Sequence, residues 1–292
     1  MNFGDENMKN YEVKNQNLSL TVSSRGAEIQ SVKVRGKEMI WQGAENMWRG
    51  KSPILFPVAG ALKDKTYTLN GVEYPMTFHG FARDNEFELV SHTENEIALK
   101  LTSNDNLKVM FPFDFEFVVR YQIEDMQVKV AFEVLNKGNN DMYFSFGSHE
   151  SYNLYGNFND FSLNFEKEEN FLSNIVVEGA LISHEQDDFG PSGKQLKLDY
   201  DLFVHNTVVF AGVNSRKVTL MHKDKKVAQV DFDAPNLLLW SQTDGPFICI
   251  EPWHNLPDFV DTNGKIENKP GIIKLEAGKK YINIHTVTYY AD

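Results

Sequence analysis

Hydrophobic and polar residues alternate with a period of two along much of this chain. The alternation is clearest over 18–23, 97–102, 111–117, 128–134 and 282–288. In the third run four phenylalanines occupy every second position, and in the last run Ile282 and Ile284 share one face with two threonines. A period of two places alternate side chains on opposite faces of an extended strand, which is typical of half-buried sheets. The pattern therefore predicts β-strands from one end of the chain to the other.

The segments between these runs have the composition of tight turns. Asn70-Gly71 separates two short strand-like segments and suits a two-residue hairpin turn. Glu124-Asp125 is expected to reverse the chain, and 137–140 to end the strand that follows. We expect only short helical turns, near 44–48 and 202–205, and a surface loop over 178–193. The predicted fold is all-β: one large antiparallel β-sandwich domain spanning 1–292.

Charge and composition narrow the classes of partner. The 292 residues contain 29 Lys and Arg against 41 Asp and Glu, a net charge of −12. This excess of negative charge argues against nucleic acid and against an anionic membrane surface as partners. Apolar runs fall short of the ~20 residues that a membrane-spanning helix needs, and the N-terminus lacks a basic segment followed by an apolar one. We expect a cytoplasmic protein, and by default a monomer.

Several common catalytic motifs are absent from the sequence. It contains no phosphate-binding loop, no dinucleotide-binding glycine turn and no nucleophile elbow around a serine. His149-Glu150 begins like a zinc-protease helix, but Asn153 stands where the second histidine would be. We therefore expect no metal and no cofactor. The single cysteine, Cys249, lies within an apolar segment and is predicted to be a buried, inert thiol.

Polar residues remain in four local settings that suit acid–base chemistry. Arg49 precedes an apolar run bounded by prolines, His79 and Arg83 flank a glycine and a phenylalanine, and His149 leaves a strand through small residues. Glu251 follows an apolar run and precedes Pro252, which is expected to end the strand at the rim of a sheet. A hydrogen-bonded structural role is an alternative for each. Together the set suits a neutral, polyhydroxylated ligand that stacks on aromatic rings.

The same four settings, in the same order, carry a resemblance to a known family. Arg49 before the proline-bounded run, the HGFAR motif over 79–83, the GSH motif over 147–149 and the ICIEPW motif over 248–253 resemble the aldose 1-epimerase (galactose mutarotase-like) family, within it the LacX-like branch. The resemblance covers nearly the whole chain. It implies a large β-sandwich, in agreement with the alternation, and a sugar as the small-molecule partner.

The resemblance also implies roles for individual residues. It assigns the general base to Glu251 and the general acid to His149, and it assigns His79 and Arg49 to sugar hydroxyls, with Arg83 as a further candidate. Asn206 aligns with a sugar-binding aspartate of the family. Two departures stand out: Asn206 is uncharged, and Glu150 occupies a position where family members usually have proline. An extra carboxylate beside the acid is expected to raise its pKa, or to mark a different substrate.

The activity implied is a cofactor-independent epimerase that interconverts the α and β anomers of an aldose. Two alternatives remain open at this point. A hexose-6-phosphate 1-epimerase needs a cluster of cations near the cleft, for which Arg83, Arg25 and Lys63 are candidates. A non-catalytic carbohydrate-binding or sensing protein on the same fold is the other.

Overall fold

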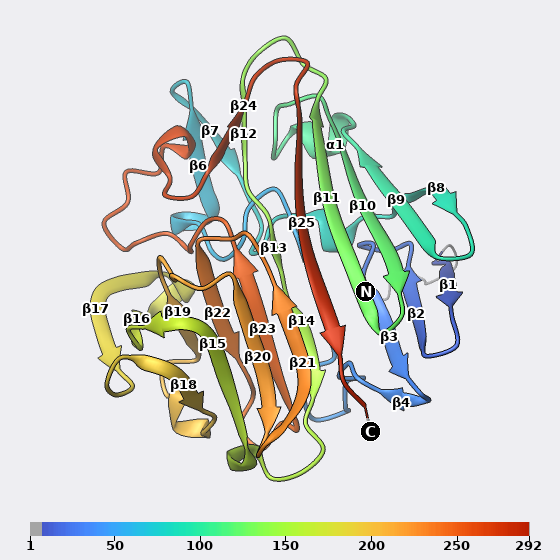
Figure 1. The fold of residues 1–292 in the computed structure, drawn as a ribbon. Coiled ribbons are helices and arrows are strands. Elements are labelled where there is room, and N and C mark those ends of the chain that lie inside the picture. The colour runs from blue at the N-terminus through green and yellow to red at the C-terminus, as the bar shows by residue number, and fades with distance from the viewer. Residues whose placement is uncertain (1–7, 292) are drawn as a thin grey trace.

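The computed structural model describes residues 8–291, and two large antiparallel sheets dominate it (Figure 1). The nine-stranded sheet consists, in spatial order, of β18 (Gly193–Lys197), β15 (Phe161–Glu169), β20 (Lys217–His222), β21 (Lys225–Asp231), β25 (Lys280–Tyr289), β11 (Gln127–Asn136), β10 (Phe115–Glu124), β9 (Glu96–Thr102) and β8 (Glu88–His92). The six-stranded sheet consists of β19 (Thr207–Phe210), β22 (Asn236–Trp240), β23 (Phe247–Trp253), β13 (Gly147–Ser148) and β5 (Ile54–Leu55), with β14 (Glu150–Asn153) also paired to β23.

Smaller sheets and short helical turns complete the fold. A four-stranded sheet contains β1 (Asn10–Lys14), β2 (Leu18–Ser23), β3 (Ile29–Val34) and β4 (Lys37–Glu38). Three strand pairs are β6 (Thr66–Leu69) with β7 (Val72–Pro75), β12 (Met142–Phe144) with β24 (Ile273–Leu275), and β16 (Leu172–Val176) with β17 (Ile182–Asp188). The helical elements are α1 (Asp105–Lys108) and the 3₁₀ turns η1 (Lys63–Lys65), η2 (Ala82–Asp84), η3 (Phe158–Asp160), η4 (Glu178–Ala180), η5 (Tyr200–Phe203) and η6 (Ile266–Asn268). Over residues 8–291, no helix is both long enough and apolar enough to cross a membrane.

The predicted all-β sandwich and its turns are confirmed. Asn70 and Gly71 join β6 to β7 with φ angles of 51° and 80°, as a type I′ turn requires. At the tip of the β10–β11 hairpin Glu124 pairs with Gln127, and β11 ends at Asn136, just before the predicted break.

Several local predictions were wrong. Residues 178–193 are not a loop: they include β17, whose side chains are mostly exposed and polar and so lack alternation. Residues 44–48 form an irregular turn, and the helical turn near 202–205 lies slightly earlier, as η5. Phe111 and Phe113 are buried but precede β10. Pro252 does not end its strand, since β23 continues to Trp253. The interruption lies instead in the neighbouring strand, at His149, between β13 and β14.

The last strand reverses the expected faces. The alternation in β25 is real, but Ile282 and Ile284 are 52% and 42% exposed, whereas Asn283 and His285 on the other face are buried. The interior face of this strand therefore carries two polar side chains that hydropathy assigns to solvent.

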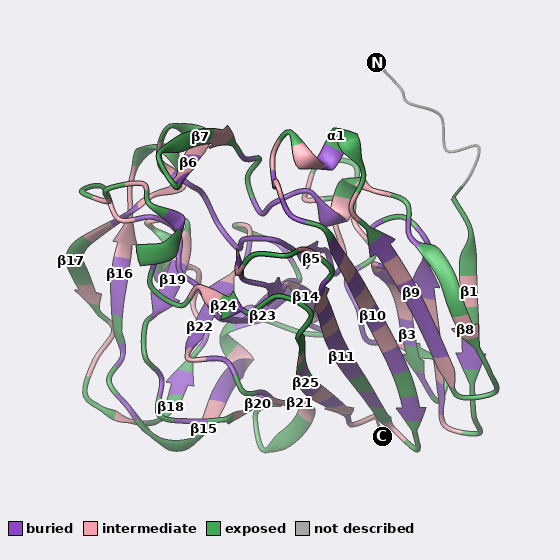
Figure 2. Cartoon of the chain, turned by 90° about the horizontal axis from the view of Figure 1, so that it is seen from above, coloured by how far each residue is buried: buried purple, intermediate pink, exposed green. Residues whose placement is uncertain are grey.

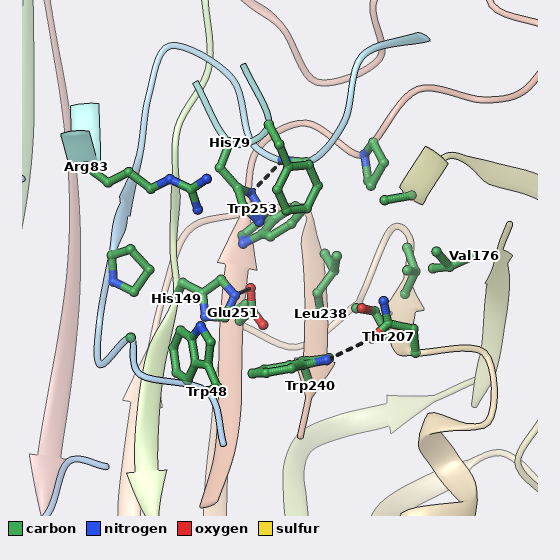
Figure 3. A pocket seen from close by; sticks show the side chains of 18 of the residues that line it. Trp48, His79, Arg83, His149, Val176, Thr207, Leu238, Trp240, Glu251 and Trp253 are labelled. Atoms are coloured by element: carbon green, nitrogen blue, oxygen red, sulfur yellow. Dashed lines mark hydrogen bonds and ion pairs between the residues drawn. The ribbon is translucent and has the colours of Figure 1, made fainter. Parts of the chain in front are cut away.

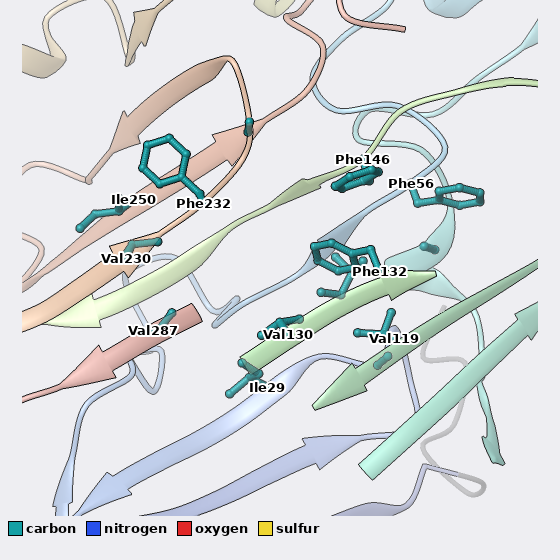
Figure 4. Close-up of a cluster of buried hydrophobic side chains, with 14 of the residues drawn as sticks. Ile29, Phe56, Val119, Val130, Phe132, Phe146, Val230, Phe232, Ile250 and Val287 are labelled. Carbon is teal, nitrogen blue, oxygen red and sulfur yellow. The ribbon is translucent and has the colours of Figure 1, made fainter. Parts of the chain in front are cut away.

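The main hydrophobic core fills the space between the two large sheets (Figure 4). Phe56 stacks on Phe117 with ring centroids 4.2 Å apart, and Val287 of β25 belongs to the same cluster as Ile250 of β23. Burial of one such large side chain stabilises the fold by roughly 1.5–3 kcal/mol. Figure 2 shows buried residues concentrated along the strands of these sheets, with exposed residues at the turns.

The period of two in β23 decides where the functional site lies. Ile248 and Ile250 point into the main core, whereas Cys249 and Trp253 belong to two small clusters on the other face of the sheet, and the buried Glu251 lies between them in the alternation. Glu251 therefore projects away from the sandwich interior, to the face on which a cavity opens.

Candidate active site

A cavity of about 390 Å³ lies against the outer face of the six-stranded sheet (Figure 3). Successive strands supply its floor: β19 gives Thr207 and Val209, β22 gives Leu238 and Trp240, and β23 gives Glu251 and Trp253. The segments before β5, after β7 and at η2 close over this floor from the other side. The described side chains that line the cavity include Glu28, Trp48, Pro53, Phe78, His79, Arg83, Asp84, His149, Val176, Asn206 and Pro257.

His149 and Glu251 meet at the bottom of this cavity. Nε2 of His149 lies 3.4 Å from Oε2 of Glu251, and their side chains are 12% and 2% exposed. His149 stands at the break between β13 and β14, beside β23, so the break directs its ring to the same face as Glu251. The predicted acid and base are thus brought together, within ion-pair distance of each other.

Burial moves the pKa values of this pair apart. It raises the pKa of Glu251 well above its usual range, because the charged carboxylate loses its hydration, and the nearby charge of Glu150 acts in the same direction. Burial lowers the pKa of His149 to about 4, against the opposing effect of Glu150. These two directions favour a proton on Glu251 over a proton on His149.

His79 occupies a rigid turn above the pair. The backbone N–H of Gly60 donates to its Nδ1 at 3.0 Å, and the His79 N–H donates to the Gly60 carbonyl at 3.0 Å. Burial lowers the pKa of His79 well below its usual range, and His149 and Arg83 add to this effect. The neutral ring accepts at Nδ1 and therefore carries its proton on Nε2. Gly80 fixes the turn, because a Cβ there would lie 2.2 Å from the Phe56 carbonyl oxygen.

Aromatic rings surround both imidazoles. Trp48 lies 5.1 Å from the His149 ring and Trp253 lies 5.4 Å from the His79 ring, measured between centroids. Trp240 packs edge-on against Trp48, and its indole Nε1–H donates to the side-chain oxygen of Asn206 at 2.9 Å. Asn206 thus fixes the Trp240 ring and keeps its amide donors for a ligand. Such rings offer the apolar surface on which the C–H face of a sugar packs.

The two predicted arginines are placed differently. Arg83 in η2 extends its guanidinium toward His149 and Trp253 in Figure 3 and lines the cavity. Arg49 is exposed and is not among the described residues that line it. The segment that carries Arg49 instead turns Trp48 inward, where its ring meets His149. Arg83, and not Arg49, is therefore in position to bind a ligand.

Comparison with known proteins places this arrangement in one family. A family model described as aldose 1-epimerase matches residues 9–282. The chain belongs to the aldose 1-epimerase family. The plasmid-encoded protein LacX of Lactococcus lactis is 32% identical over 94% of this chain and 98% of its own length. Among solved structures, a galactose mutarotase related enzyme from Lactobacillus acidophilus has a TM-score of 0.90 at 31% identity, covering 97% of this chain and 98% of its own. A galactose mutarotase-like protein from Lactobacillus casei has a TM-score of 0.91 at 28% identity, covering 97% and 100%.

Sequence reasoning missed two residues in the cavity of this family member. Glu28 lines the cavity and accepts backbone N–H bonds from Lys51 and Ser52 at 3.0 and 2.9 Å. It therefore anchors the segment that carries Trp48. Trp240 forms part of the wall, yet it ends an apolar strand and resembles a core residue in sequence. Neither residue has a local signal, because each acts through a partner far away in the chain.

One donor set of this aldose 1-epimerase family member has the composition of a metal site. Ligand atoms of His149, Cys249 and Glu251 all lie within 4.8 Å of one another. Burial raises the pKa of the Cys249 thiol well above its usual range, which opposes the thiolate that a metal would need. Cys249 is fully buried, as predicted.

Proposed function

We propose that this chain is an aldose 1-epimerase that interconverts the α and β anomers of an aldose. The observation that carries the proposal is the contact of 3.4 Å between His149 and Glu251 at the floor of an aromatic cavity. The two oxygens that must exchange protons in this reaction, O1 and the ring oxygen O5, are both bonded to C1. An acid and a base that lie side by side can therefore reach both oxygens from one side of the sugar.

The reaction balances without any further reactant. Glu251, as carboxylate, removes the proton from the C1 hydroxyl; the C1–O5 bond breaks with its electron pair on O5, and O5 takes the proton of His149. The product is the open-chain aldehyde with a free hydroxyl. Rotation about C1–C2 presents the other face of the carbonyl, and reversal of both transfers closes the other anomer. Each positioned proton transfer contributes roughly 10²–10⁴-fold to the rate.

The scheme requires that the pair hold one proton in total. Two forms of the pair meet this requirement. In the first, Glu251 is protonated and His149 is neutral; in the second, Glu251 is ionised and His149 is protonated. Transfer of one proton between Nε2 and Oε2 interconverts them. The raised pKa of Glu251 and the lowered pKa of His149 favour the first form. Sugar hydroxyls that donate to Glu251 favour its ionised form, and so favour the second.

The remaining residues suit binding of a neutral sugar. The Nε2–H of His79 is a donor held in place by Gly60, and Arg83 supplies further donors on the same side of the cavity. Trp48 and Trp240 offer ring faces, and Asn206 offers an amide. These contacts would orient the ring so that C1 lies over the acid–base pair.

This cavity is less suited to binding a hexose 6-phosphate than a neutral sugar. Arg83 is the one Lys or Arg among the described residues that line it, and the acidic Glu28 and Asp84 line it as well. The other two cations considered from the sequence, Arg25 and Lys63, are not part of the lining. A doubly charged phosphate needs several cations or backbone donors.

Polarimetry on freshly dissolved α-sugars tests the proposal. We expect the wild-type chain to accelerate the approach to anomeric equilibrium for at least one aldose in a screen, and glucose to saturate it more readily than glucose 6-phosphate. Glu251→Gln should remove most of the acceleration while circular dichroism shows the fold intact. Measurable sugar binding without any rate above that of buffer would contradict the epimerase and favour a carbohydrate-binding protein.

A further inference from the structure

Glu150 lies directly behind the acid–base pair, on the opposite face of the same sheet. It pairs with Ile250 in the register of β14 and β23, so its side chain points into the sandwich interior, whereas Glu251 one residue further points into the cavity. Glu150 is 1% exposed. Its Oε1 lies 2.7 Å from Nε2 of His285, which projects inward from β25 of the nine-stranded sheet.

This contact joins the two large sheets through polar side chains inside an otherwise apolar core. A buried pair of this kind rarely adds net stability over well-packed apolar residues of the same volume, because both groups lose their hydration. The second carboxylate oxygen of Glu150 is buried and has no hydrogen-bond partner. Packing alone therefore gives no reason for a carboxylate at this position.

We propose that Glu150, held by His285, is a positioning residue of the epimerase: it places a buried negative charge behind the sheet that keeps one proton on the His149–Glu251 pair. The inference rests on the proposed function of that pair. Glu150 does not line the cavity, so it acts on the sugar only through the two residues that do.

The surroundings of Glu150 favour its charged form. Its pKa is lowered although burial acts to raise it, because His285 attracts and binds the carboxylate. The other titratable groups that Glu150 influences electrostatically are the hydroxyls of Tyr121, Tyr152 and Tyr289 and, across the sheet, the Cys249 thiol, His149 and Glu251. The three tyrosines and the cysteine have raised pKa values and stay neutral, while Glu28 and Glu38 act on two of those tyrosines from further away.

The direction of the effect is the same for both members of the pair. The charge of Glu150 raises the pKa of Glu251 and also raises that of His149. It therefore opposes loss of the one proton that the reaction needs, wherever that proton sits on the pair. Removing the charge should move the alkaline limb of the pH–rate profile to lower pH. For a neighbouring charge buried in the protein we expect a displacement of about one pH unit.

Glu150→Gln tests this inference, because Gln keeps the size and an acceptor oxygen for His285. The matched control is Glu169→Gln: Glu169 is also a buried carboxylate, 4% exposed, but it accepts N–H bonds from Asn214 and Ser215 outside the cavity lining. Both variants are expected to lose stability. Only Glu150→Gln should move the alkaline limb of kcat/KM, and Glu150→Asp, which keeps the charge, should restore it.

A second readout does not depend on catalysis. The ring resonance of His149, assigned by its loss in His149→Asn, reports the loss of the proton from the pair as pH rises. In Glu150→Gln its alkaline midpoint should fall by about one pH unit, and in Glu169→Gln it should match the wild type. If Glu150→Gln does not fold in plain buffer, the titration is repeated in trimethylamine N-oxide, which stabilises folded chains.

The two readouts separate the failure of the inference from that of the proposed function. Equal midpoints in Glu150→Gln and wild type would overturn the role of Glu150, even if the enzyme is active. A shifted His149 midpoint in a chain without epimerase activity would support the electrostatic coupling and contradict the epimerase.

Discussion

Glu150 and Glu251 are two buried carboxylates on neighbouring strands, and they differ in almost every other respect. Glu150 faces the interior, contacts His285 at 2.7 Å and has a lowered pKa. Glu251 faces the cavity, lies 3.4 Å from a histidine whose own pKa is lowered, and has a raised pKa. The difference shows that burial alone does not fix the protonation of a carboxylate. The charged form of a buried carboxylate is favoured only where a partner group replaces the hydration that it has lost.

The two faces of the six-stranded sheet thus have different roles: one packs in the core and the other lines the cavity. Its inner face supplies core residues such as Ile248 and Ile250, and its outer face supplies Glu251 and Trp253. Because side chains alternate along each strand, the core fixes the strands that carry the site. Glu150 is an exception: it belongs to the inner face and yet acts on the outer one.

The largest expected effect comes from Glu251→Gln. Gln cannot take the proton from O1, so the epimerase rate should fall roughly 10²–10⁴-fold. The melting temperature should stay equal or rise, because a carboxyl whose pKa is raised by burial costs stability at neutral pH and an amide does not. Polarimetry and thermal unfolding on the same preparation check both parts. A variant with near-wild-type rate would show that Glu251 is not the base.

Replacing the two imidazoles separates proton transfer from binding. His149→Asn should lower kcat by roughly 10²-fold or more with little change in KM, because the proton donor acts in the transition state. His79→Asn should change both constants, because the sugar contact that we propose for the Nε2–H of His79 exists in the ground state and in the transition state alike. Rates are corrected for the folded fraction. If kcat suffers more from His79→Asn, the two roles are reversed.

The fold was largely predictable because its signals are local. The alternation along 128–134 and the Asn70-Gly71 turn each depend on neighbouring residues, and both are confirmed. The inner face of β25 was not predictable in this way. Its alternation is unambiguous, but whether Ile284 or His285 faces the core depends on Glu150, 135 residues earlier in the sequence.

The sequence predicted which residues gather at the cavity better than how each side chain points, and their chemical roles stay predictions. Local motifs identified His79, His149 and Glu251, and the structure brings all three together. The same motifs did not show that Arg49 remains exposed while Arg83 enters the cavity, since both arginines lie within two residues of an aromatic residue in sequence. A sequence pattern gives no direction for a long side chain that leaves an irregular segment.

Replacing the two arginines sharpens this point. Arg83→Gln should raise KM about tenfold, which corresponds to the loss of one charged hydrogen bond to the sugar. Arg49→Gln should leave KM and kcat unchanged, because Arg49 does not line the cavity. Both side chains are on the surface side of the fold, so neither change should affect the melting temperature much. A larger effect from Arg49→Gln would mean that its segment moves when sugar binds.

The smallest effect expected is on the pH dependence of stability, and it involves both faces. The pKa of His149 and that of His254, beside Phe146, are each lowered to about 4, and the pKa of His79 is lowered well below its usual range, so all three rings stay neutral in the fold. In the unfolded chain they take up protons below pH ~6.5, so each costs stability as the pH falls from there toward 4. Glu251 acts in the opposite sense.

The raised pKa of Glu251 contributes stability that is complete below its unfolded value of about 4.5 and is lost as the pH rises through the folded value. Between pH 5 and 6.5 the effect of the three histidines on the pH dependence of the free energy of unfolding is therefore larger than the opposite effect of the single carboxyl. The free energy of unfolding should fall with decreasing pH by at most about 1.4 kcal/mol per pH unit for each net proton. Urea unfolding at pH 5 and pH 7 measures this difference in the free energy of unfolding. His254→Asn, which leaves the cavity intact, should lower the number of protons taken up on unfolding by about one, and so make the difference smaller. Equal stability of the wild type at both pH values would mean that these imidazoles are not held neutral, and the contrast drawn between the two carboxylates would lose its electrostatic basis.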